Sequence, residues 1–378
     1  MNPIRSSPAC VLPPHILRHI IANGSDAQRD KALQTTHFSD QFREKRAGVQ
    51  EKAAVTAAMV ASPVGGKMRS VYTAEFKADL PGRLVRQEGG LPTNDPASDE
   101  AYDGAGATYD LFSEVYQRNS IDGSGMHLNS TVHYQQGYDN AFWNGQQMVY
   151  GDGDEDMPAN QRLFNRFTIA LDVIGHELTH GVTQATANLV YMNQPGALNE
   201  SFSDIFGSLV KQRQKGQLAK DADWIIGEGL FSSNVRGVGL RSMKAPGTAY
   251  DDPVLGKDPQ PAHMQNYVNT TDDNGGVHIN SGIPNHAFYL TAQEIGGFAW
   301  EKTGKIWYTT LATQVTSNIN FLDMANLTLA VAGQLYGSNS VEQHAVRKAW
   351  NSVGIALLET SNPNPGCMPG VLKLFKGG

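Results

Sequence analysis

The sequence has little cysteine and no long apolar run. Only Cys10 and Cys367 occur in 378 residues, which argues against a disulfide framework. No apolar stretch approaches the roughly 20 residues that cross a bilayer, so no membrane-spanning helix is expected. The first 30 residues also lack a secretory pattern, because Pro13 and Pro14 interrupt their most apolar piece. The sequence alone therefore predicts a cytoplasmic protein, or one secreted without a recognisable signal peptide.

Charge is unevenly divided along the chain. Residues 1–50 contain seven Lys or Arg and four Asp or Glu, a net charge of +3, whereas the whole chain has a net charge of −7. The remainder therefore has a net charge of −10 and no basic stripe, which argues against a nucleic-acid partner. These opposite charges favour binding of the basic N-terminal segment to the acidic remainder of the same chain, although a solvated tail would show the same charge pattern.

The order of local patterns predicts an α+β fold. The first 45 residues look like a small helical unit, with a helix start at Pro13-Pro14 and a capping box from Ser25 to Gln28. The charged stretch 43–48 is typical of a linker. Strand-like runs follow from Met68, and an α-helical part comes last. Helix-length patterns cover residues 164–184, 199–214, 285–301, 303–316, 322–335 and 340–353.

The sequence HELTH at 176–180 lies within one of these helical patterns. Residues four apart share a helix face, so His176 and His180 can bind one metal ion, and Glu177 can reach a water on that ion. Catalytic zinc takes three protein ligands and leaves a fourth position open. Glu200 is the candidate third ligand, and Asp204 follows it on the next helical pattern. This second segment argues against a chance occurrence of the motif.

The stretch from 173 to 209 closely resembles the thermolysin-like metallopeptidases. Two more segments match in the right order, NAFWNG at 140–145 with MVYGDG at 148–153, and DNGGVHINSG at 273–282. The match covers roughly residues 68 to 360. The first 50 residues resemble instead the short propeptide of the protealysin subgroup.

The resemblance implies a two-lobed catalytic domain behind a small helical propeptide. A β-rich N-terminal lobe and an α-helical C-terminal lobe would enclose a zinc cleft. We expect an inhibitory propeptide at 1–50, an N-terminal lobe at 51–182 that ends in the HELTH helix, and a C-terminal lobe at 183–378. The implied protein is the precursor of a neutral zinc endopeptidase that binds one zinc ion and acts on proteins or peptides. Its other expected partner is its own propeptide, in cis, and no membrane partner is expected.

The resemblance also implies roles for individual side chains. Glu177 would act as general base and then general acid. Tyr191 and His278 would donate hydrogen bonds to the developing oxyanion. Asp273 would orient His278, and Asp204 would hold a ligand histidine in one tautomer.

Substrate contacts follow from the same resemblance. The substrate main chain would be held by Asn140, Ala141 and Arg241. An apolar pocket for the residue just after the scissile bond would be lined by Phe164, Val173, Ile226, Leu230 and Leu240. This lining predicts a preference for a bulky apolar residue there, although core packing alone also explains any one of these side chains.

One departure from the family pattern concerns calcium. Lys211 stands where the family has an acidic ligand of a calcium pair, while Asp172, Asp223 and Glu228 remain. Calcium requires many oxygen ligands, and an ammonium group removes ligands and repels the ion. We therefore expect no calcium pair, with Lys211 among the remaining acids in its place.

The propeptide is expected to inhibit by docking over the zinc cleft. Pro13 and Pro14 match a motif of the short propeptides and are already close to extended, which would present Ile16 and Leu17 to an apolar pocket. The thiolate of Cys10 could instead bind the zinc ion, as in a cysteine switch, or the thiol could be free.

Two other functions agree less well with the sequence. A zinc aminopeptidase would need a group that binds the free amine, and no Gly-x-Met-x-Asn segment of that kind is present. A catalytically silent zinc-binding scaffold would have no chemical reason to keep Glu177, Tyr191 and His278 together.

Overall fold

The computed structural model describes residues 10–53 and 66–357. Helix α1 (Pro14–Asn23) begins directly after Pro13. Helix α2 (Asp26–Ala53) follows the expected capping box, in which the Ser25 N–H donates to Gln28 Oε1 at 2.8 Å. Because α2 continues without a break through 43–48, the linker predicted there is wrong. Arg, Glu and Lys in this stretch are good helix formers.

A mixed five-stranded sheet forms most of the N-terminal lobe. Its strand order is β2-β1-β3-β5-β4, with β1–β3 and β3–β5 parallel and the two outer pairs antiparallel. Strand β4 therefore ends one side of the sheet. The elements of this lobe are β1 (Arg69–Thr73), β2 (Arg83–Gln87), α3 (Pro96–Asp110), β3 (Leu128–Val132), β4 (Ala141–Trp143), β5 (Met148–Tyr150) and α4 (Leu171–Ala185).

The C-terminal lobe is helical, with four two-residue strands in its connections. The strands are β6 (Ile225–Ile226), β7 (Arg241–Ser242), β8 (Asp251–Asp252) and β9 (Gly256–Lys257). The helices are α5 (Asn193–Lys215), α6 (Asp273–Asn280), α7 (Gly282–Ile295), α8 (Lys302–Thr313), α9 (Phe321–Tyr336) and α10 (Val341–Ser352). The predicted α+β fold with a helical second lobe is confirmed.

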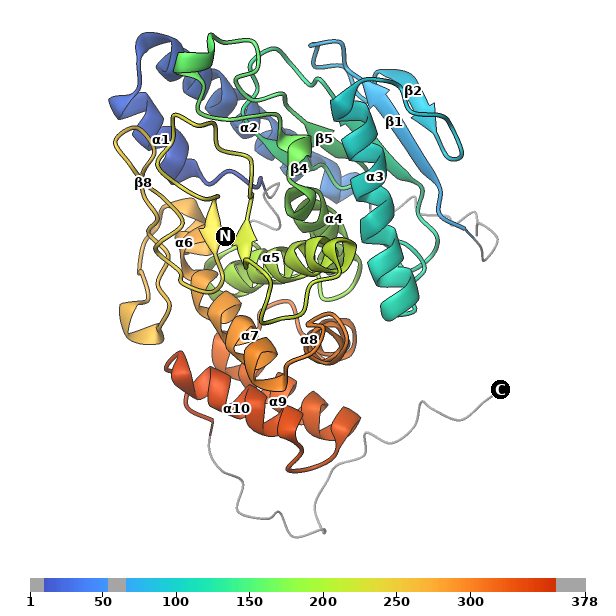
Figure 1. The fold of residues 1–378 in the computed structure, drawn as a ribbon, viewed down its shortest axis with the longest axis vertical. Coiled ribbons are helices and arrows are strands. Elements are labelled where there is room, and N and C mark those ends of the chain that lie inside the picture. The colour runs from blue at the N-terminus through green and yellow to red at the C-terminus, as the bar shows by residue number, and fades with distance from the viewer. Residues whose placement is uncertain (1–9, 54–65, 358–378) are drawn as a thin grey trace.

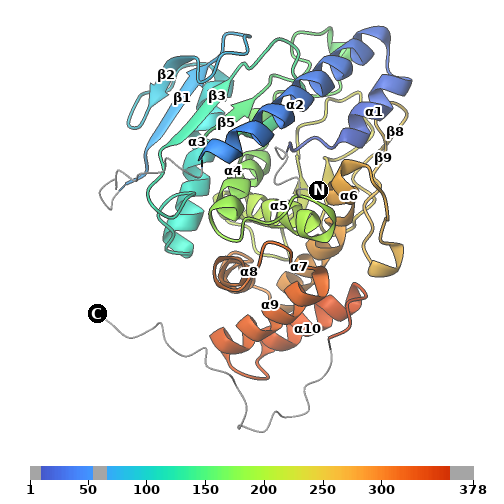
Figure 2. The same cartoon turned by 180° about the vertical axis from the view of Figure 1, so that it is seen from behind.

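The two lobes meet along α4 and α5, which lie at the centre of the molecule (Figure 1). Seen from behind, α2 passes across the sheet toward α4, and α1 lies to one side, next to β8 and β9 (Figure 2). Side chains from α1, the sheet, α4, α5 and the C-terminal helices belong to one continuous apolar core. No helix in the described ranges is long and apolar enough to cross a membrane.

Several helix boundaries differ from the sequence patterns, and two of these differences have a clear local cause. The helix expected from residue 164 begins at Leu171, because Phe164 pairs with Phe231 in an isolated bridge before it. The helix expected to reach residue 301 ends at Ile295, where Gly296 and Gly297 take φ values of 71° and 69°. Those left-handed conformations suit glycine and stop the helix.

Candidate active site

The HELTH helix presents its polar side chains to the interior of the protein. His176, Glu177 and His180 lie on α4 and are buried. Helix α5 crosses α4 at Gly175 and Gly207, where a Cβ atom on Gly207 would lie 2.4 Å from the Asp172 carbonyl oxygen. Only glycine permits so close an approach.

The crossing brings Glu200 of α5 to the two histidines. His176 Nε2 lies 3.1 Å from His180 Nε2 and 3.5 Å from Glu200 Oε2, and His180 Nε2 lies 3.6 Å from Glu200 Oε1. Ligand atoms around a tetrahedral zinc ion, each about 2.0–2.2 Å from it, lie about 3.3–3.6 Å apart. Glu200 Oε2 is also buried without a hydrogen-bond partner. The three predicted ligands therefore fit a zinc ion, and no other such group of His, Cys, Asp or Glu occurs in the described part of the chain.

Hydrogen bonds fix the orientation of both histidine rings. His176 Nδ1 lies 2.8 Å from Asp204 Oδ1, so the predicted contact with a ligand histidine is present. His180 Nδ1 lies 2.8 Å from Asn199 Oδ1 and 3.0 Å from Ser203 Oγ. These partners leave each Nε2 free for a metal ion. Sequence reasoning missed Asn199 and Ser203, although both lie in the segment NESFSD at 199–204, which also contains Glu200 and Asp204.

Glu177 lies beside the ligand group and is fully buried. Its Oε2 accepts the Trp143 N–H at 2.9 Å, whereas its Oε1 has no hydrogen-bond partner. Burial raises the pKa of Glu177 well above its usual value, and the nearby Glu200 acts in the same direction, while the N–H groups of Trp143 and Val11 oppose the shift. A carboxyl group with a raised pKa suits transfer of a proton near neutral pH.

On the other side of the ligand group lies His278, on α6. The segment before it turns through Asn274, Gly275 and Gly276, all with positive φ, and this turn brings Asp273 back to His278. Asp273 Oδ1 lies 2.7 Å from His278 Nδ1, and its Oδ2 accepts the His278 N–H at 2.9 Å. Burial lowers the pKa of His278, but Asp273 and Glu200 outweigh it and raise the pKa to about 9.

Tyr191 completes this side of the site. Its hydroxyl group donates to Glu200 Oε1 and lies 3.4 Å from His278 Nε2. All four residues predicted to act in catalysis, Glu177, Tyr191, Asp273 and His278, are thus brought around one centre.

Residues 10–12 of the N-terminal segment lie beside β4, where Cys10 forms an isolated antiparallel bridge with Phe142. The Val11 N–H donates to the Ala141 carbonyl at 3.3 Å. The side chain of Asn140 accepts the Leu12 N–H at 3.0 Å and donates to the Leu12 carbonyl at 3.5 Å. Asn140 and Ala141, predicted to hold a substrate main chain, here hold the chain's own backbone.

The carbonyl groups of the same segment face two more predicted site residues. The Cys10 carbonyl accepts from His278 Nε2 at 3.1 Å, and the Val11 carbonyl accepts from Arg241 Nη1 at 3.1 Å. Arg241 is fixed by Asp204, which it contacts through Nε and Nη2 at 2.8 Å each, and Asn285 Nδ2 donates to the same carboxylate at 2.8 Å. Sequence reasoning missed Asn285, which lies in a helical pattern without a local signal.

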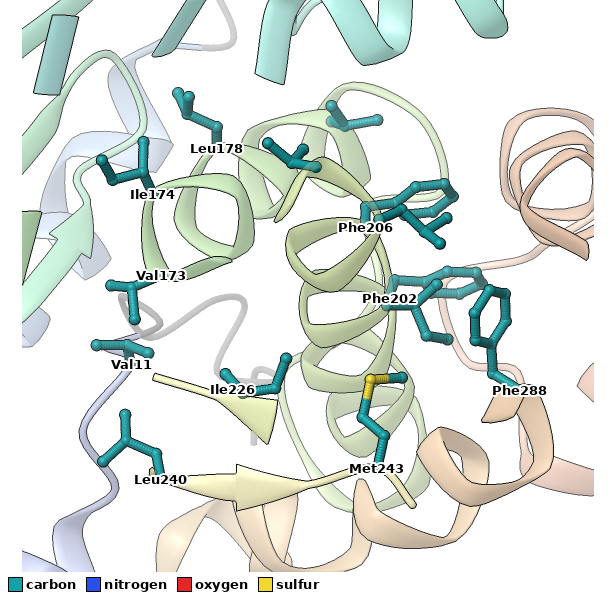
Figure 3. Close-up of a cluster of buried hydrophobic side chains, with 14 of the residues drawn as sticks. Val11, Val173, Ile174, Leu178, Phe202, Phe206, Ile226, Leu240, Met243 and Phe288 are labelled. Carbon is teal, nitrogen blue, oxygen red and sulfur yellow. The ribbon is translucent and has the colours of Figure 1, made fainter. Parts of the chain in front are cut away.

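The side chain of Val11 is fully buried beside Val173, Ile226 and Leu240 (Figure 3). Phe164 and Leu230, the other expected pocket residues, are fully buried in the same core cluster. Ile16 and Leu17, predicted to enter an apolar pocket after Pro13 and Pro14, are buried on α1 instead.

The expectation that an extended Pro13-Pro14 pair presents Ile16 and Leu17 to the pocket is therefore wrong. The proline pair starts a helix, so the extended segment that enters the cleft comes before it. The sulfur of Cys10 is not part of the group of possible metal ligands, although the residue itself is buried.

Lys211, on α5, lies among acidic side chains that come from other segments of the chain. Its ammonium group lies 2.8 Å from Asp172 Oδ2, 2.8 Å from Asp223 Oδ1 and 3.8 Å from Glu228 Oε2. It also donates to the Ile225 carbonyl at 2.6 Å. The ion pairs expected from the sequence are therefore present, and they balance the buried carboxylate of Asp172.

Comparisons with known proteins agree with this geometry. A family model described as the catalytic domain of thermolysin metallopeptidases matches residues 25–184, and one described as their alpha-helical domain matches residues 187–355. The chain belongs to the thermolysin family of metallopeptidases. It is a metalloprotease with a propeptide, since a model described as the protealysin propeptide matches residues 10–37.

Individual relatives extend over nearly the whole chain. An extracellular metalloprotease of Pectobacterium carotovorum subsp. carotovorum is 50% identical over 93% of this chain and 98% of its own length. The solved structure of the protealysin precursor from Serratia proteamaculans has a TM-score of 0.82 at 50% identity, over 92% of this chain and 100% of that one. These matches confirm the predicted subgroup and the two-lobed fold.

The predicted cytoplasmic location is wrong. The Pectobacterium relative is named an extracellular metalloprotease. A Serratia marcescens relative, 41% identical over 80% of this chain and 82% of its own length, is named an extracellular minor metalloprotease. These names point to secretion, and the sequence argument failed because the lack of a recognised secretory pattern does not exclude export.

Proposed function

We propose that this metalloprotease is a zinc endopeptidase whose N-terminal segment inhibits it in cis. The observation that carries the proposal is the position of residues 10–12. The peptide link between Cys10 and Val11 lies where a substrate bond would be cut, with His278 at its carbonyl oxygen and Glu177 near its nitrogen. A bound segment in this position excludes any substrate from the cleft.

The proposed mechanism assigns one task to each side chain. Zinc at His176, His180 and Glu200 would supply Lewis-acid polarisation of a peptide carbonyl and of the attacking water. Glu177 accepts the proton of that water and passes it to the departing amine. Tyr191 and His278 donate hydrogen bonds to the oxyanion as it forms, and such a donor is typically worth about 2.7–4 kcal/mol.

Substrate selection is proposed to follow the contacts of Val11. A substrate residue in its place would have its carbonyl held by Arg241, its N–H near Ala141 and its side chain in the apolar pocket. We therefore propose a preference for Leu, Ile, Phe or Val just after the scissile bond.

Two further expectations remain proposals. Residues 1–50 form the inhibitory propeptide, 51–182 the N-terminal lobe and 183–378 the C-terminal lobe. The family's calcium pair is replaced by Lys211, because its ammonium group lies among the acids that remain. The alternative of a catalytically silent scaffold is not favoured, since the full-length relatives are named proteases.

The test of inhibition compares one preparation before and after loss of the propeptide. We expect casein hydrolysis by the intact chain to be low and to rise when residues 1–50 are removed by processing. If the intact chain is as active as the processed one before any cleavage has occurred, inhibition in cis is wrong.

A further inference from the structure

Lys31 of the propeptide lies in an acidic site on the catalytic body. It extends from α2, which passes over the sheet near β5 (Figure 2), and only 11% of its side chain is exposed. Its ammonium group lies 3.0 Å from the Gly153 carbonyl oxygen, 3.0 Å from Asp154 Oδ1 and 2.5 Å from Asp156 Oδ1. Three oxygen atoms from one loop thus surround a single positive charge.

A third acidic side chain, that of Asp139, interacts electrostatically with the same charge. Asp139 is 4% exposed, and its Oδ1 has no hydrogen-bond partner. Burial raises the pKa of Asp139 well above its usual value, and the charged groups that act on it are Asp154, Lys31 and Asp156. Its backbone N–H donates to Thr35 Oγ1 of α2. A buried, unpartnered carboxylate oxygen beside two more carboxylates is costly unless a cation is present.

The positive charge of this site belongs to the segment that maturation is proposed to remove. Loss of Lys31 would leave Asp139, Asp154 and Asp156 together without a counter-charge. We propose that the carboxylates of Asp154 and Asp156 and the Gly153 carbonyl form a binding site for a divalent cation of the calcium type, with Asp139 as a further negative charge nearby. Lys31 occupies the site in the precursor, and the ion replaces it after the propeptide leaves.

The ligand atoms suit such an ion. Calcium takes six to eight oxygen ligands at about 2.3–2.6 Å, mostly carboxylates, carbonyls and water. The three oxygens around the Lys31 nitrogen lie at most 3.0 Å from it, so shifts of about half an ångström would bring them to calcium distances. Asp154 is held in place without the lysine, because its Oδ2 accepts the N–H groups of Leu163 and Phe164 at 2.8 and 3.0 Å.

The site has a route to solvent. A cavity of about 360 Å³ is lined in part by Gly137, Gly153 and Asp156, and Asp156 is 40% exposed. A Cβ atom on Gly137 would lie 2.6 Å from Lys31 Cε, so this glycine makes room for the lysine stem. Water and ions can therefore reach the carboxylates when the stem is gone. At Lys211, by contrast, the ammonium group belongs to α5 and stays after processing.

The test uses the full chain in a Glu177→Gln background, which keeps the precursor uncut. Calorimetric titration with calcium chloride should detect no binding at this site in the parent and about one ion per chain in Lys31→Met. Millimolar calcium should raise the melting temperature of Lys31→Met by about 3 °C or more and leave the parent unchanged. Adding Asp154→Asn to Lys31→Met should abolish both effects.

Lys257→Met is the matched control, since it removes an exposed lysine whose ammonium group lies 4.0 Å from a single carboxylate oxygen, Asp251 Oδ2, among the described residues. It should respond to calcium as the parent does. The proposal is overturned if folded Lys31→Met binds no calcium at millimolar concentrations, or if Asp154→Asn does not change the binding.

Should Lys31→Met fail to fold, the same titration on the naturally processed enzyme and its Asp154→Asn variant decides the question. Calcium binding in the Glu177→Gln background does not depend on proteolysis. A negative titration therefore contradicts the calcium site alone and does not contradict the proposed protease function.

Discussion

Replacing Val11 by alanine should weaken the self-inhibition of the precursor. The Val11 side chain is fully buried, and the change removes two methyl groups from an apolar pocket. At about 0.8 kcal/mol for each group, plus the cavity that remains, docking should lose about 2 kcal/mol. Since 1.4 kcal/mol is a factor of about ten, the fraction of undocked chains should rise about 30-fold.

The assay is the initial rate of hydrolysis of a fluorogenic peptide by freshly purified, uncut precursor. We expect Val11→Ala to be faster than the wild type, and Val11→Asp to be faster still, because its carboxylate would enter an apolar pocket beside Glu177. Leu33→Ala is the matched control, since Leu33 lies on α2 of the same propeptide but is 49% exposed. Equal rates for wild type and Val11→Ala, with both chains intact, would refute the proposed docking.

Three more results are expected. Millimolar calcium should leave the melting temperature of the precursor almost unchanged, and a calcium-induced rise of several degrees would contradict this. Lys211→Met should cost about 3–5 kcal/mol in urea denaturation, because it leaves the buried carboxylate of Asp172 unpaired. The double variant Pro13→Ala, Pro14→Ala should raise precursor activity because it removes the proline pair that starts α1, whereas Cys10→Ser should leave it unchanged because the Cys10 sulfur is not among the possible zinc ligands. Hydrogen bonding to Asp152 leads the effects that raise the pKa of His133 to about 9, so its stabilisation is complete below about pH 6.5 and is lost as the pH rises through 9. The stability difference between wild type and His133→Gln should shrink over that range, and a constant difference would show that the ion pairs contribute nothing.

Much of the site could be predicted because its parts lie close together in the sequence. His176, His180 and Glu200 are on two successive helices, and helical spacing alone places the first two on one face. Tyr191 and His278 carry no such local signal, and only the family resemblance pointed to them.

Contacts between distant segments could not be predicted in this way. The entry of Val11 into the pocket depends on pairing with Ala141 at the start of β4. These residues are 130 positions apart in the sequence, and no local sequence pattern predicts such a contact. The contact of Lys31 with the loop after β5 is of the same kind. The continuation of α2 through 43–48 was missed because charge was taken to indicate a linker, although the same residues favour a helix.

Glu177 is proposed to transfer protons at a zinc ion held by His176, His180 and Glu200. The most direct test measures zinc content and casein hydrolysis in processed wild type and in processed Glu177→Gln, cut by added protease where necessary. We expect about one zinc ion per chain in both proteins, and in the variant a loss of activity of about 10²-fold or more. A variant that binds zinc normally and cleaves casein at the wild-type rate would contradict it.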